Sequence, residues 1–135
     1  MGDISKNFSL KEFFSANDKG KTFKAKQPTQ ALLDTLEAIR AEAGKEVFIN
    51  SGIRSVEYNA RLKGSSPNSG HLTGEAADIY VNGMSNRQLG AVIRQLHKSG
   101  KLPHLAYTYL IKDSNRAVHV GVDKKKRASI WGAGY

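Results

Sequence analysis

The segment Ser69-Gly70-His71-Leu72-Thr73-Gly74-Glu75-Ala76-Ala77-Asp78 carries an imidazole and a carboxylate, with small residues between them. Both groups bind divalent metal ions, and a third candidate ligand, His119, lies far downstream in the segment 117–122. Two histidines and one carboxylate are a common ligand set for a catalytic zinc ion, whose fourth position stays open for water. If the three side chains converge, the sequence predicts a hydrolase.

The spacing of these ligands predicts how they reach one another. His71 and Asp78 are seven residues apart, which is not the spacing of a ligand pair on one helix turn. We expect His71 in a loop and Asp78 on a strand over 76–81. Alternation along a second strand, 117–122, places His119 on the same face as Ala117 and Gly121. If the two strands are neighbours, Asp78 and His119 share a face and the loop brings His71 over them.

The remaining pattern predicts an α+β fold, with helices packed on a small, mainly antiparallel sheet. Helical spacing indicates helices at 9–14, from Pro28 to Gly44, at 55–62 and after Ser85, the first with Ser9 as cap and Glu12 in a capping box. Strands are expected at 46–51, 76–81, 105–111 and 117–122. Polar loops are expected around Gly20 and over 64–70. The length predicts a single domain, 1–135.

Composition limits the classes of function. The chain has no cysteine, so a metal ion must be held by nitrogen and oxygen ligands. Its net charge of +9, from 21 Lys and Arg against 12 Asp and Glu, favours an anionic partner such as a cell-wall polymer. No nucleic-acid motif is visible, and the basic run 123–127 is typical of a solvated turn. No segment resembles a signal peptide or a transmembrane helix, which predicts synthesis in the cytoplasm. A monomer is expected.

A family resemblance strengthens the metal hypothesis. The pattern Ser69-x-His71-x-x-Gly74-x-Ala76-x-Asp78 resembles the signature of the zinc D-Ala-D-Ala carboxypeptidase family. That family also includes L-alanyl-D-glutamate endopeptidases and phage endolysins, and its members cut peptidoglycan stem peptides. Three further blocks, 4–13, 51–55 and 118–120, are similar to blocks of the family and follow one another in the same order. The resemblance implies a hedgehog-like fold and a zinc peptidase that meets the bacterial wall, either as an endolysin made in the host cytoplasm or as part of a virion.

The resemblance also implies roles for single residues. His71, Asp78 and His119 would hold Zn2+, and Arg54 would bind the substrate and polarise the scissile carbonyl. Arg54 has a plainer interpretation as a surface arginine that pairs with a nearby acid. Ser69 would hydrogen-bond the bound peptide, although serine in such a segment equally often caps a turn.

The general base is missing from its usual places. Many relatives carry an acid three residues before the last histidine ligand or two residues after it, and here Arg116 and Gly121 stand there. We rank His104 and Asp113 close together as candidates for the proton-transfer role, with Asp123 as a third. The gap leaves an alternative function: a catalytically impaired, zinc-containing module that binds the wall or belongs to a virion. A basic nucleic-acid-binding domain ranks last.

Overall fold

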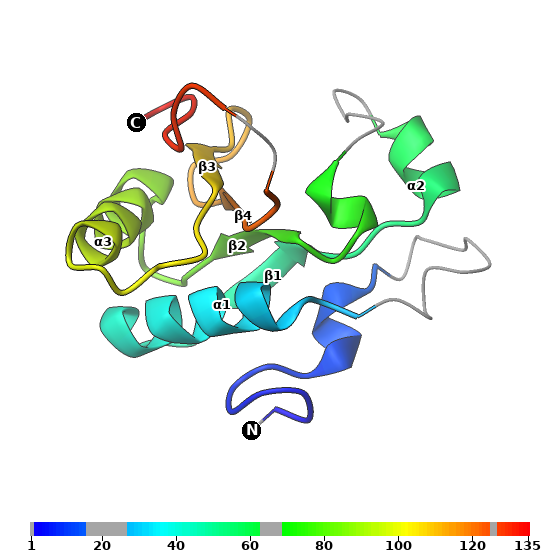
Figure 1. Cartoon of the computed structure of the whole chain (residues 1–135), viewed down its shortest axis with the longest axis horizontal. Coiled ribbons are helices and arrows are strands. Elements are labelled where there is room, and N and C mark those ends of the chain that lie inside the picture. Colours follow the sequence, from blue (N-terminus) through cyan, green and yellow to red (C-terminus); the bar gives the residue numbers. More distant parts are fainter. Residues whose placement is uncertain (1, 16–26, 63–68, 125–126) are drawn as a thin grey trace.

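The computed structural model describes residues 2–15, 27–62, 69–124 and 127–135 (Figure 1). The expected loop around Gly20 and residues 64–68 of the second expected loop lie outside these ranges. In chain order the elements are η1 (Leu10–Phe13), α1 (Gln30–Ala43), β1 (Phe48–Ser51), α2 (Val56–Arg61), η3 (Gly70–Leu72), β2 (Ala76–Tyr80), α3 (Asn86–Lys98), β3 (Tyr107–Leu110) and β4 (Val118–Gly121). The α+β prediction is confirmed.

The four strands form one open antiparallel sheet in the order β1-β2-β4-β3. The last two strands form a hairpin, and β4 inserts beside β2, so that segments far apart in sequence become neighbours. In this register Asp78 lies directly opposite His119. An irregularity between Ile49 and Ser51 in β1 places Ser51 opposite Asp78 on the other side.

The helix boundaries follow from local side-chain chemistry. The Thr29 side chain accepts a hydrogen bond from the Leu32 amide at the start of α1, and Gly44 ends that helix with φ at 66°. Ser85 and Gln88 form a capping box at the start of α3. The helix expected at 9–14 is a single 3-10 turn, because Phe14 has extended backbone and bridges to Ile53.

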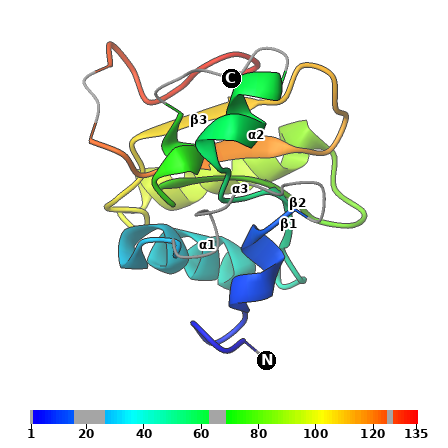
Figure 2. The same cartoon turned by 90° about the vertical axis from the view of Figure 1, so that its right-hand side faces the viewer.

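The sheet has one face in the core and one face toward the site. Ala77, Ile79, Val118 and Val120 pack with α1 and α3 in the hydrophobic core. Figure 2 shows α1 on one side of the strands and α2 on the other. Since side chains alternate along a strand, Asp78 and His119 point away from this core. The fold therefore presents both on the sheet face that α1 leaves uncovered.

Among the described residues, no helix is both long and apolar enough to cross a bilayer.

Candidate metal centre and its cleft

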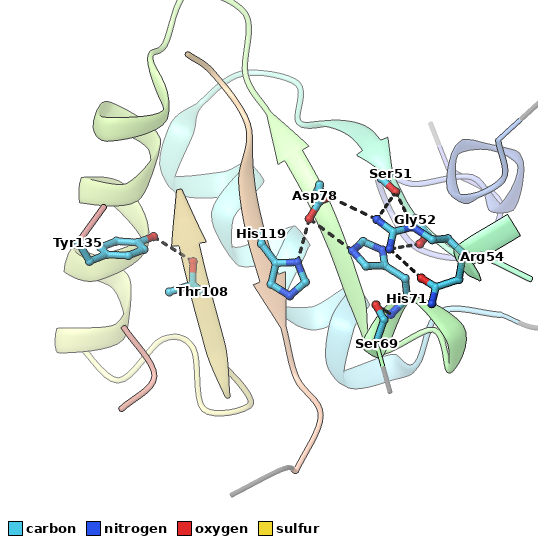
Figure 3. A network of polar contacts seen from close by, with 10 residues as sticks. Ser51, Gly52, Arg54, Ser69, His71, Asp78, Thr108, His119 and Tyr135 are labelled. Carbon is cyan, nitrogen blue, oxygen red and sulfur yellow. Dashed lines mark hydrogen bonds and ion pairs between the residues drawn. The ribbon is translucent and has the colours of Figure 1, made fainter. Parts of the chain in front are cut away.

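Three side chains from three elements converge on the open face of the sheet (Figure 3). Asp78 Oδ1 lies 2.8 Å from His119 Nδ1 and 3.4 Å from His71 Nε2. One potential ligand atom from each residue lies within 4.8 Å of the other two, and all three residues are buried. The expected convergence of β2, β4 and the segment around His71 is present, with His71 in the short turn η3 rather than in an irregular loop.

His71 is oriented by a backbone group. Its Nδ1 lies 2.6 Å from the carbonyl oxygen of Gly52, which can only accept, so Nδ1 carries the proton and donates it. In the neutral ring Nε2 then holds a bare lone pair. That lone pair and Asp78 Oδ1 are two acceptors facing each other at 3.4 Å. A cation between them satisfies both, so the donor set fits a metal ion, and the carbonyl supplies the outer-shell contact typical of a histidine ligand.

His119 is held from two sides. Its Nδ1 faces Asp78, and the Tyr109 ring stacks on it with centroids 4.6 Å apart and planes at 12°. Tyr109 was not identified from the sequence as a site residue. The hairpin register that places it opposite His119 would have been the signal. A stacked aromatic ring limits rotation of the imidazole and shields it from water.

The electrostatics of the triad favour a deprotonated ligand set. Burial acts to raise the pKa of Asp78, but the hydrogen bond from His119 and the adjacent imidazole of His71 outweigh it and hold that pKa well below its usual range. Burial lowers the pKa of His119, with hydrogen bonding to Asp78 opposing the change. Near neutral pH the site thus combines a carboxylate with a neutral imidazole, the protonation states that metal binding requires.

Arg54 lies beside the triad rather than at the surface. Its Nη1 donates to Asn59, its Nε and Nη2 donate to Ser51, and Nη2 is 3.8 Å from Asp78 Oδ2. Burial lowers the pKa of Arg54 and Asp78 opposes that change, yet a guanidinium remains charged at neutral pH. Arg54 thus pairs with an acid, and that acid is a candidate metal ligand facing the cleft; its contact with substrate stays a prediction.

A cleft of about 770 Å³ surrounds the triad. Arg54, Ser69, Asp113 and Tyr109 line it together with the three candidate ligands. The Ser69 side chain accepts a hydrogen bond from the His71 amide, which is the capping role; its contact with substrate stays a prediction. Asp113 is exposed where it lines the cleft.

His104 lies elsewhere. It is exposed and lines a second hollow of about 440 Å³ together with Pro103, Ala106 and Val122. Asp123 and Arg127 line both the cleft and this second hollow. Arg116, at one of the positions where the family resemblance led us to expect an acid, places its guanidinium 3.8 Å from the centroid of the Tyr80 ring. The structure thus brings Asp113 and Asp123 to the cleft wall and leaves His104 in the neighbouring hollow.

Comparison with known proteins assigns the chain to a family of peptidases. A sequence model of the Peptidase M15 family matches residues 6–123, a range that contains the whole triad, Arg54 and the cleft-lining strands. No curated protein sequence matches the chain. The match is to metallopeptidases, so the buried His71, Asp78 and His119 group is the part of the molecule that could hold their metal ion.

Proposed function

The chain belongs to the Peptidase M15 family, and from this premise we propose that it is a zinc-dependent peptidase that hydrolyses an amide bond in peptidoglycan stem peptides. One observation carries the proposal: the two facing acceptors, His71 Nε2 and Asp78 Oδ1, with His119 Nδ1 beside them. These are nitrogen and oxygen ligands only, as a chain without cysteine must use.

Zinc held by His71, Asp78 and His119 would lower the pKa of water to about 7 and polarise the scissile carbonyl. The other residues bind and orient the substrate. Arg54 has its guanidinium fixed by Ser51 and Asn59, so it meets the developing oxyanion without reorganisation. Its partly buried position strengthens this interaction, since the local dielectric is lower than that of water.

The substrate class follows from the family and from charge. A peptidase family implies a peptide substrate, and the stem peptide of peptidoglycan is the member of that class we propose. The chain's net charge of +9 would hold it near anionic wall polymers. The enzyme would cut either a D-Ala-D-Ala bond, as a carboxypeptidase, or an L-Ala-D-Glu bond, as an endopeptidase. The fragments that it releases identify which bond is cut.

We further propose that the protein acts at the bacterial wall as a phage lysin, either an endolysin released from the host cytoplasm or a component of a virion. The compact size and basic charge support this assignment. We propose that it works as a monomer.

Clearing of purified cell walls tests the function. Zinc-loaded protein is tested in gels that contain purified walls of several chemotypes. It is expected to clear walls of at least one chemotype. A chelator should abolish clearing, and added Zn2+ should restore it. No clearing on any chemotype would reject catalysis.

The alternative, a catalytically impaired zinc-containing wall-binding or virion module, is favoured by Arg116 and Gly121 at the positions where relatives keep an acid. It predicts that the protein sediments with walls and contains zinc but releases no peptide.

A further inference from the structure

Amide hydrolysis in this cleft needs a proton acceptor besides the candidate ligands. Among the described residues, the buried carboxylates are Asp78 and Asp123, with relative exposures of 8% and 4%. Asp78 faces both histidines and is committed to the triad. Asp123 lies just beyond β4, two residues after Gly121 and four after His119, and lines the cleft wall.

Gly70 makes room for the Asp123 carboxylate beside the triad, and Gly121 lies next to it. A Cβ atom at Gly70 would lie 3.1 Å from Asp123 Oδ2, and a Cβ atom at Gly121 would lie 3.9 Å from that oxygen and 3.5 Å from His119 Nε2. Neither glycine has a positive φ, so backbone conformation does not explain them. Gly70 precedes the ligand His71 in the chain. The carboxylate therefore occupies a notch between the two segments that carry the histidines.

Arg127 pairs with this buried carboxylate and orients it. Its Nη1 donates to Asp123 Oδ1 at 2.7 Å, and its Nη2 donates to Oδ2 at 3.2 Å. The guanidinium also lies 4.4 Å from the Tyr107 ring centroid. Asp123 Oδ1 makes the shorter contact with Arg127. Asp123 Oδ2 is the oxygen that lies next to both glycine positions. The pair forms part of the wall shared by the cleft and the second hollow. Lys124 and His104 are the other ionisable side chains that line the hollow, and the cleft wall adds Glu12, Lys112 and Asp113 to Arg54, the triad and three tyrosines.

We propose that Asp123 is the proton-transfer residue of this peptidase. This inference rests on the proposed function and names the group that completes it. Asp123 Oδ2 takes a proton from the attacking water as the water oxygen bonds to the scissile carbonyl carbon. When the carbon–nitrogen bond breaks, the same carboxyl group gives that proton to the leaving amine. The carboxylate returns to its starting state, and one water is consumed for each bond cut.

The first test compares kinetic constants of zinc-loaded variants on wall fragments. Asp123→Asn is expected to lower kcat by about 100-fold or more while KM changes little, the effect usual for loss of a general base. Asp34→Asn, an exposed carboxylate on α1, is the matched control and should match the wild type. Asp113→Asn and His104→Gln test the rival candidates. A larger loss of kcat in either rival than in Asp123→Asn would overturn the proposal.

Two further variants separate proton transfer from a structural ion pair. Arg127→Gln keeps the carboxylate and removes its cation, so the acid limb of the kcat profile should move to higher pH, with activity recovered above it. Gly121→Asp added to Asp123→Asn returns a carboxylate next to His119 Nε2 and should restore part of kcat. If Arg127→Gln and Asp123→Asn lose stability and kcat in parallel, and Gly121→Asp restores nothing, Asp123 is only structural.

A third measurement needs no wall substrate. Acetohydroxamic acid gives up a proton when it binds a metal centre as an anion. Calorimetry in buffers of different ionisation enthalpy counts the protons that reach the buffer. In the zinc-loaded wild type, Asp123 should take up that proton, so it does not reach the buffer. The Asp123→Asn variant should release about one more proton per site to the buffer. Equal release from the two proteins rejects the proposal. A protein that passes this test but cuts no wall fragment contradicts the proposed function instead.

Discussion

At the scale of single residues, Tyr109 and Gly52 determine how the two histidines are oriented. The Gly52 carbonyl fixes the tautomer of His71, and the Tyr109 ring lies flat on His119. Neither group binds the metal in the arrangement we propose. Each reduces the freedom of a ligand before metal binding, which lowers the entropic cost of assembling the site.

The Tyr109 stack gives a prediction that separates the ring from its hydroxyl group. Tyr109→Ala should weaken Zn2+ binding by about 10-fold, within the range for groups that support a ligand, because His119 gains rotational freedom. Tyr109→Phe keeps the stacked ring and should bind Zn2+ as the wild type does. Competition with a chromophoric chelator measures both dissociation constants. Equal weakening in the two variants would show that the hydroxyl, not the stack, matters.

The sequence was sufficient to predict the three candidate ligands, but not the groups that orient them. His71, Asp78 and His119 follow from ligand chemistry, strand alternation and the motif. The Gly52 carbonyl has no residue signature, since any backbone could supply it. Tyr109 depends on the register of the hairpin, and the place of Asp123 depends on the space that Gly70 leaves.

At the scale of elements, a carboxylate on α1 holds the N-terminal segment to the fold. Glu37 accepts hydrogen bonds from the Ser5 hydroxyl, the Asn7 amide nitrogen and the Asn7 side chain. Burial acts to raise the pKa of Glu37, but these donors outweigh it and lower that pKa from 4.5. The segment continues to η1, which contacts β1 and closes the core around Phe8 and Phe13.

This contact predicts a pH-dependent stability difference. Because the folded-state pKa of Glu37 is depressed, its contribution is fully present above pH 4.5 and is lost as pH falls through the folded-state value. Glu37→Gln should lower the free energy of unfolding by about 1 kcal/mol at pH 7, with the difference shrinking toward strongly acid pH. Urea unfolding at several pH values measures it. Glu42→Gln, exposed on the same helix, should show no such difference, and a pH-independent gap for Glu37→Gln would contradict the account.

The elements were predicted well in kind and order, and less well at their ends. Caps at Thr29 and Ser85 are local, so α1 and α3 begin where the sequence indicates. The strands expected at 46–51 and 105–111 pair only over β1 and β3, because pairing is decided by the partner strand. The irregularity that places Ser51 beside Asp78 has the same origin.

At the scale of the whole molecule, a metal ion would link elements that are distant in sequence. The triad links η3, β2 and β4, because each element contributes one buried ionisable side chain. A ligand that binds only the folded state stabilises it by mass action. The apo protein must instead keep Asp78, Arg54 and two imidazoles together without that cation.

Zinc should therefore raise the unfolding temperature. At about 100 times the dissociation constant the gain is about 2.7 kcal/mol. For a domain of this length that corresponds to a rise of roughly 10 °C. Differential scanning calorimetry with and without Zn2+ measures it, and His71→Ala should show no rise. An equal rise in His71→Ala would place the zinc ion at another site.

The net charge predicts that wall association depends on salt. Association with purified walls should fall steeply as ionic strength rises from about 0.05 M to about 0.5 M, because screening lengths drop below 10 Å. Sedimentation with walls measures it. His71→Ala should sediment as the wild type does, since it leaves the basic surface intact. Binding that is insensitive to salt would show that charge does not retain the protein.

Mass spectrometry of peptidoglycan fragments, after digestion by zinc-loaded protein and by His71→Ala, tests the central claim most directly. The account predicts that the wild type releases fragments from one defined amide bond of the stem peptide. His71→Ala should release none of them. The identity of the fragments reports which bond is cut. Identical fragments from both proteins, or none from the wild type, would contradict a peptidase centred on His71, Asp78 and His119.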